Sequence, residues 1–121
     1  MSCIVIYGKT GGVENIIHHI RETSATGLKL LVYEHADVFR TVLPDKVDVI
    51  WITIDSVLDV EAARQLRRVY PQAPLIIVGS DYMAALKAVE LGAIYYLDRN
   101  AGADEVTEAL QRIWSEVQYG Y

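Results

Sequence analysis

The sequence predicts an α/β domain in which a parallel sheet of five strands is covered by helices on both faces. Two observations lead to this fold class. Short runs rich in Val and Ile alternate along the whole chain with segments whose apolar residues recur at helical spacing. The third of these runs, residues 47–54, is almost continuously apolar, as expected for a strand that helices cover on both sides.

The predicted strands are short and are bounded by glycine, proline or polar residues. They span residues 3–7, 28–33, 47–54, 75–78 and 94–97. Parallel neighbours need a crossover connection of about a dozen residues or more. Each gap between these runs is long enough for one helix, so the strands are expected to be parallel.

The predicted helices fill those gaps and follow the last strand. They span residues 13–24, 35–43, 60–70, 82–91 and 104–117. Asp81 is placed to cap the fourth helix, and Gly92 to end it. At this size an open, doubly wound (βα)5 sheet of the flavodoxin-like kind, with strand order 2-1-3-4-5, is the natural arrangement. We therefore expect residues 1–121 to form a single domain.

Composition and charge exclude several classes of function. Eleven basic residues stand against sixteen acidic ones, giving a net charge of −5, and no basic run is longer than Arg67-Arg68. Direct nucleic-acid binding by this domain is not expected, because phosphate neutralisation dominates that affinity. Cys3 is the only cysteine, and the apolar run that it begins is too short for a signal peptide or a membrane span. A soluble, cytoplasmic protein without membrane contact is expected.

The first glycine-rich turn, Gly8-Lys9-Thr10-Gly11-Gly12, contains part of a phosphate-binding loop. Such a loop needs a glycine five residues before its Gly-Lys-Thr, so that backbone N–H groups wrap the phosphates. That position is Cys3, inside the first strand. An ordinary turn between a strand and a helix is therefore favoured over nucleotide binding.

One part of the sequence resembles a known family closely. The segment from Asp81 to Leu97 reads Asp-Tyr-Met-Ala-Ala-Leu-Lys-Ala-Val-Glu-Leu-Gly-Ala-Ile-Tyr-Tyr-Leu. It resembles the fourth helix and fifth strand of response-regulator receiver (CheY-like) domains, most of all those that precede LytTR-type DNA-binding domains. Residues 61–67 are similar to the receiver third helix, and residues 74–78 to the fourth strand. Their order and spacing extend the resemblance over the whole chain.

The resemblance implies a phosphotransfer site at the carboxyl ends of the strands. In receivers an Asp ending strand three accepts the phosphoryl group, and two acidic residues after strand one help to hold Mg²⁺. A Ser or Thr after strand four and a Lys after strand five bind the phosphoryl oxygens. The acceptor position matches Thr53 here, and the acidic pair matches Tyr7 and Gly8. The hydroxyl position matches Gly79, with Ser80 one step beyond, and the Lys position matches Arg99. The resemblance therefore implies a degenerate receiver, with no metal site and no cofactor.

Asp55 leaves an alternative open. If the third strand ran two residues further, Asp55 would take the acceptor position with the same side-chain direction, since strand side chains repeat with period two. The favoured interpretation is an exposed loop or helix-capping aspartate, because a lone Asp cannot readily assemble a Mg²⁺ site. Arg99 either pairs with Asp55, Asp98 or Asp59 or is a partly exposed surface residue.

Four residues are predicted for a switch and interface surface. Tyr96 matches the aromatic switch position of receivers, and Tyr95, Tyr82 and Met83 lie near it in the sequence. Tyr95 and Tyr96 must face opposite ways, because adjacent strand residues alternate. Through the fourth helix, fifth strand and fifth helix, the resemblance implies a homodimer.

The predicted function is that of a regulatory module rather than an enzyme. It would act by dimerisation or partner binding without phosphorylation, and would control transcription through a DNA-binding output domain following Tyr121. Two rivals remain: a working receiver that uses Asp55, and a sensor that binds an anion or metabolite in the emptied crevice. Tyr7, Gly8, Gly79 and Arg99 would line that crevice.

Overall fold

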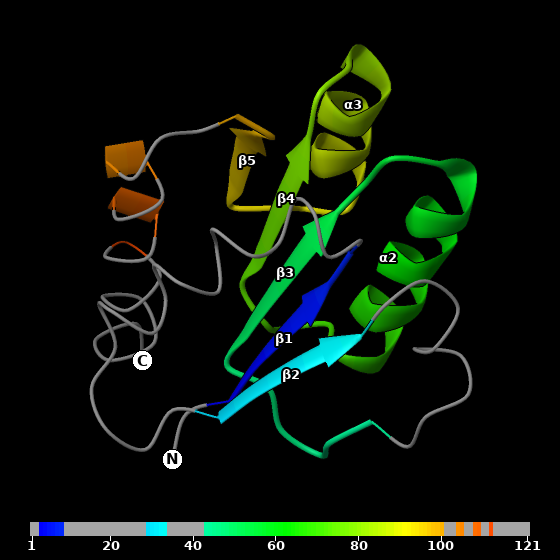
Figure 1. The fold of residues 1–121 in the computed structure, drawn as a ribbon. Coiled ribbons are helices and arrows are strands. Elements are labelled where there is room, and N and C mark those ends of the chain that lie inside the picture. The colour runs from blue at the N-terminus through cyan, green and yellow to red at the C-terminus, as the bar shows by residue number, and fades with distance from the viewer. Residues whose placement is uncertain are drawn as a thin grey trace.

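The computed structural model describes residues 3–8, 29–33, 43–100, 104, 105, 108, 109 and 112. The helices predicted at residues 13–24 and 35–43, and most of the one at 104–117, lie outside the described residues. The described part is a parallel sheet with two helices on one face (Figure 1).

The sheet contains five strands, and every neighbouring pair is parallel. They are β1 (Cys3–Tyr7), β2 (Lys29–Tyr33), β3 (Val49–Thr53), β4 (Leu75–Gly79) and β5 (Tyr95–Asp98). Their order is β2-β1-β3-β4-β5. The predicted fold class and strand order are thus confirmed.

Some strand limits differ from the prediction. β3 starts at Val49, two residues later than expected, because Val49 is the first residue of this run that pairs with β1. β4 and β5 each run one residue further than expected, since Gly79 and Asp98 pair with each other. Pairing between strands, which hydropathy does not report, sets these limits.

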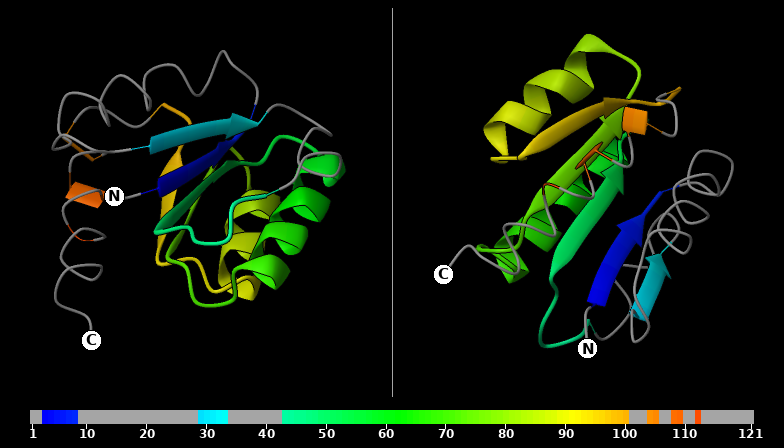
Figure 2. Two further views of the ribbon diagram at one scale, coloured as in Figure 1. Left: turned by 90° about the horizontal axis from the view of Figure 1, so that it is seen from below. Right: turned by 90° about the vertical axis from the view of Figure 1, so that its left-hand side faces the viewer.

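Helices α2 (Val57–Val69) and α3 (Tyr82–Glu90) lie on the same face of the sheet, while the described part of the last helix lies on the other face (Figure 2). α2 begins three residues before the predicted start at Val60. Its N-cap is Ser56, whose N–H donates to the Asp59 carboxylate at 3.0 Å. None of the described helices is long and apolar enough to cross a membrane.

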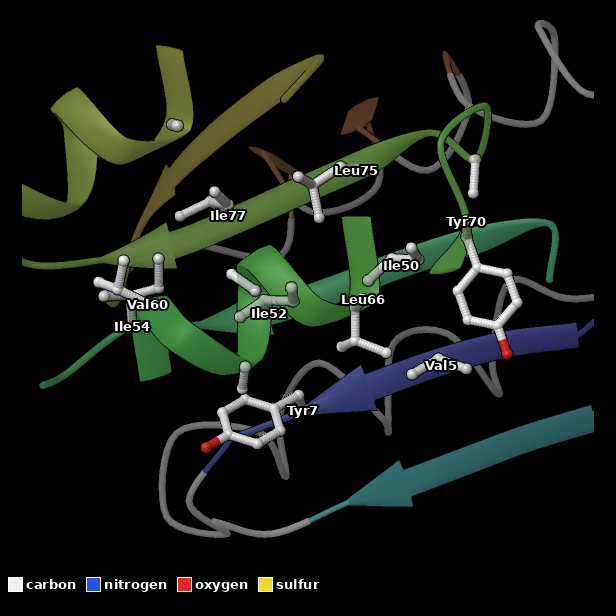
Figure 3. Packing of buried hydrophobic residues seen from close by; sticks show 14 of the residues in the cluster. Val5, Tyr7, Ile50, Ile52, Ile54, Val60, Leu66, Tyr70, Leu75 and Ile77 are labelled. Atoms are coloured by element: carbon white, nitrogen blue, oxygen red, sulfur yellow. The ribbon is translucent and has the colours of Figure 1, made fainter. Parts of the chain in front are cut away.

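The core lies between the sheet and these two helices. Figure 3 shows side chains from three strands meeting those of α2. The labelled strand residues are Val5, Tyr7, Ile50, Ile52, Leu75 and Ile77, and those of α2 and its flanks are Ile54, Val60, Leu66 and Tyr70. Ala84 and Ala88 are the buried residues of α3, so small side chains let this helix approach the sheet closely.

Arg67 forms hydrogen bonds with the backbone that follows α2 and with the backbone that follows α3. Its guanidinium donates to five backbone carbonyls at 2.8 to 3.4 Å, those of Tyr70, Pro71, Ala73, Leu91 and Gly92. Burial lowers the pKa of Arg67 from its usual value. Gly92 follows α3 at φ +70°, a left-handed conformation that turns the chain toward β5. This arrangement fixes the amino ends of β4 and β5, opposite the candidate site.

Candidate functional site

Strand order reverses between β1 and β3, so a functional crevice is expected at their carboxyl ends. β1 ends at Tyr7, which is 1% exposed. Gly8 follows at φ +152°, outside the range that residues with a Cβ readily adopt, and its N–H donates to the Tyr33 carbonyl at 3.1 Å. The glycine-rich turn thus begins with a backbone that requires glycine.

The Tyr7 hydroxyl donates to Oδ1 of Asp59 at 3.0 Å. Asp59 lies in the first turn of α2 and is only 3% exposed. Its Oδ2 accepts the backbone N–H of Asp55 at 2.7 Å and that of Ser56 at 3.0 Å. One carboxylate therefore joins the end of β1, the loop after β3 and the start of α2. We name residues 55–59, which lead from the loop after β3 into the first turn of α2, the β3–α2 junction.

Asp59 is the site residue that sequence reasoning missed. The sequence indicates it only as one possible partner of Arg99, before the helix predicted to begin at Val60. The spacing Ser56-x-x-Asp59 is a helix-start signal, in which the third helical residue accepts from the N-cap backbone. This signal places Asp59 inside α2, but it does not indicate the contact between Asp59 and Tyr7.

Asp55 and Arg99 form an ion pair between the β3–α2 junction and the residue after β5. The side chain of Asp55 is 18% exposed, so the expectation of an exposed aspartate is wrong. It is not the helix cap either, because that position belongs to Ser56. The backbone N–H of Arg99 donates to the Gly79 carbonyl at 2.9 Å. Arg99 thereby connects the ends of β3, β4 and β5.

Thr53, the residue aligned with the receiver acceptor, is buried in β3. Its hydroxyl has no hydrogen-bond partner among the residues that the structure describes, and neither has the indole N–H of Trp51. The two side chains share one face of the strand, since they are two residues apart. Ile50 and Ile52 belong to the same core cluster as Tyr7 and Trp51 does not, so Thr53 lies with Trp51 on the opposite face of the sheet from the Tyr7–Asp59 contact.

Gly79 is the last residue of β4 and Ser80 follows it, at the receiver hydroxyl position. Gly79 is buried, and a Cβ added to it would lie 2.3 Å from the Cβ of Ala84 and 3.4 Å from the Tyr96 hydroxyl oxygen. Ser80 is exposed. A residue with a side chain at position 79 would thus push α3 away from the sheet.

We expect Gly79→Ala to destabilise the protein by about 1–3 kcal/mol, the usual cost of overpacking. The free energy of unfolding in urea measures this effect. Ala84→Gly removes the clashing methyl group, so the double variant should lose less stability than the two single changes added together. Additive losses would show that contact with Ala84 is not the reason for glycine here.

The four predicted switch and interface residues do not form one surface. Tyr96 packs against the core and its hydroxyl donates to the Asp81 carbonyl at 3.3 Å, while Met83 is half-buried against the same core. Burial, and then the charges of Asp98 and Asp81, raise the pKa of Tyr96. Tyr95 has its ring beneath the guanidinium carbon of Arg112, 5.6 Å from the ring centroid.

Of these four residues only Tyr82 is classed as exposed, at 78%. It belongs to a set of exposed residues that sequence reasoning missed. Leu86 and Val89 are 45% and 80% exposed on the same helix. Their spacing of four and then three residues puts them in one line along the helix. We name Tyr82, Leu86 and Val89 the α3 stripe.

No group of three or more His, Cys, Asp or Glu side chains placed to hold a metal ion occurs within the described residues. A hollow of about 420 Å³ lies at the opposite end of the sheet from the crevice. Arg67, Ala73, Glu90, Gly92 and Ile94 are among its lining residues. The Arg67 guanidinium in this hollow already donates to backbone carbonyl groups, such as those of Leu91 and Ala73. We therefore assign the hollow a structural role and not a binding role.

No family model matches the chain, and no curated protein matches its sequence. Solved structures do match its fold. A CheY-like response regulator receiver domain protein from Methanospirillum hungatei JF-1 is 11% identical, with a TM-score of 0.74 over 100% of this chain and 99% of that one. The response regulator DrrB of Thermotoga maritima, an OmpR/PhoB homologue, is 14% identical with a TM-score of 0.74 over 96% of this chain and 54% of that one.

A third structure belongs to a protein described as the pilus assembly protein cpaE of Burkholderia thailandensis E264. It is 19% identical, with a TM-score of 0.74 over 95% of this chain and 99% of that one. The structural neighbours are thus mostly receiver domains. At these identities the likeness shows the receiver fold.

Proposed function

We propose that this chain is a receiver-like signalling module whose crevice is closed by its own side chains. In this proposal it acts by binding a protein partner and does not take up a phosphoryl group or Mg²⁺. The observation that carries the proposal is that both carboxylates of the β3–α2 junction already have partners. Asp59 is held by Tyr7 and two backbone N–H groups, and Asp55 by Arg99.

These contacts do not fit a Mg²⁺ site. The ion takes near-octahedral oxygen ligands and is bound through carboxylates whose oxygens are available. Here both oxygens of Asp59 already accept hydrogen bonds, and the positive charge near Asp55 is a guanidinium. The residues after β1 are a phenol and a glycine, which supply no carboxylate. We propose that Arg99 neutralises Asp55 and that the Tyr7 hydroxyl orients Asp59 by a hydrogen bond, in place of a metal.

The test is exposure of the protein to acetyl phosphate and Mg²⁺, followed by intact-mass spectrometry. We expect no added phosphoryl mass, because Asp55 is ion-paired and Asp59 is fully hydrogen-bonded. A receiver domain that phosphorylates under the same conditions is the positive control. An added phosphoryl group that Asp55→Asn removes would contradict the proposal.

That outcome would support the second candidate function, a receiver that uses Asp55. One contact favours it: Asp55 is paired with Arg99, so the aspartate after β3 meets the cation after β5. The resemblance assigns the acceptor and the phosphoryl-binding Lys to these same two strand ends. The absence of a carboxylate at Tyr7 and Gly8 weighs against it.

The wider role is part of the same proposal. We infer a non-enzymatic, cytoplasmic regulator formed by one domain, which controls transcription when joined to an output domain beyond Tyr121. The partner surface would comprise α3, β5 and the helix at 104–117. It could bind a second copy of the chain or a different protein.

A further inference from the structure

The α3 stripe leaves this helix apolar on two sides. Ala84 and Ala88 are buried against the sheet, while Tyr82, Leu86 and Val89 are 78%, 45% and 80% exposed. A helix that is apolar on opposite sides is normally covered on both. The spacing of four and three residues is that of a seam between two packed helices.

From this stripe we propose, resting on the function inferred above, that α3 binds a basic amphipathic helix of another protein and not a second copy of this chain. The partner has an apolar stripe of its own, flanked by Lys or Arg. The choice between these two occupants depends on the charges around the stripe.

Acidic residues stand at both ends of the stripe. Asp81 precedes Tyr82 and is exposed, and Glu90 follows Val89 with 57% of its side chain exposed. The one basic residue of α3, Lys87, is paired with Glu90 on its own helix at 3.0 Å. Asp98 is also exposed, and the raised pKa of Tyr96 reflects the negative charges of Asp98 and Asp81 besides its burial.

A second copy fits this pattern poorly. In an antiparallel pair that places Tyr82 opposite Val89, each Asp81 meets the Glu90 of the other copy. In a parallel pair, each acidic residue meets its own counterpart. Lys87 offsets only one of the two acids, so each copy brings a net negative charge to the contact. Like charges placed opposite one another are destabilising, so neither arrangement is complementary. Basic residues flanking the apolar stripe of a partner would meet Asp81 and Glu90 favourably.

The test uses two synthetic helices of equal length with leucine at the seam positions. One carries Lys at the flanking positions and the other carries Glu. We expect fluorescence anisotropy to show that the Lys probe binds at least about tenfold more tightly, and that salt reduces this preference by screening. Sedimentation of the chain alone at about 100 μM should show a monomer. The Kd of any self-association would then lie above that concentration.

Three variants locate the binding. Val89→Ser should weaken binding of the Lys probe, because it removes an exposed apolar side chain from the stripe. Glu90→Lys should lessen the preference for Lys over Glu. Val57→Ser makes the same change on α2, at a valine that is 70% exposed, and should leave binding unchanged. Circular dichroism of each variant checks that the fold is kept.

Equal binding of both probes, no binding of either, or a dimer that Val89→Ser dissociates would each overturn this assignment. The outcome is distinguishable from failure of the proposed function. Phosphoryl uptake at Asp55 would remove the phosphorylation-independent mechanism while leaving a charge-selective α3 stripe in place. Loss of charge selectivity without phosphoryl uptake would remove the proposed role of the α3 stripe while leaving the phosphorylation-independent mechanism in place.

Discussion

Asp59→Ala should lower the free energy of unfolding by about 2–4 kcal/mol, the range expected for losing a buried, charged hydrogen-bond acceptor. The change removes the acceptor of the Tyr7 hydroxyl and of two backbone N–H groups at the start of α2. It also removes the negative charge from the first turn of that helix. Urea denaturation followed by far-ultraviolet circular dichroism measures the effect.

Two matched variants test this explanation. Tyr7→Phe keeps the ring and removes the hydroxyl group, so it should cost about 1.5–3 kcal/mol, the value of one hydrogen bond to a charged group. Glu61→Ala removes an exposed acid two residues further along α2 and should cost under about 0.5 kcal/mol, as exposed ion pairs do. A loss for Asp59→Ala as small as that for Glu61→Ala would contradict the central role given to Asp59.

Arg67→Ala should lower the free energy of unfolding by about 2–3 kcal/mol, since hydrogen bonds from a charged donor each contribute more than neutral ones. The guanidinium serves carbonyls from the turn after α2 and from the turn after α3. Without it, these carbonyl groups near the core lose their donor. The same urea experiment measures the loss.

Arg67→Lys separates charge from geometry. A lysine keeps the positive charge but cannot reproduce the planar fork that reaches both turns, so it should recover less than half of the lost stability. Arg68→Ala is the neighbouring control, because Arg68 is exposed, and it should change stability by under about 0.5 kcal/mol. Full recovery by lysine would mean that charge alone matters at position 67.

The fold could be predicted because its signals are local and repeated. Each strand is a short apolar run, and parallel strands require long crossovers, so alternation alone restricts the topology. The limits of β3 and α2 could not be predicted as well. The first depends on pairing with β1, and the second on a cap in which Asp59 reaches back to Ser56.

The candidate site was only partly predictable. Its location at the carboxyl ends of β1 and β3 follows from the topology, and the residues that stand at the strand ends follow from the sequence. The pairing of Arg99 with Asp55, from among three possible acids, depends on the distance between β3 and β5. The exposure of Leu86 and Val89 depends on which side of α3 the small residues Ala84 and Ala88 occupy.

The sequence by itself determined the α/β class, the strand order and the absence of carboxylate side chains at Tyr7 and Gly8, because hydropathy and residue identity are properties of the chain alone. Only the tertiary structure decided that Tyr7 donates to Asp59 and that Asp55 is paired with Arg99. The residues of each contact lie 52 and 44 positions apart, and only the parallel sheet brings their strand ends together.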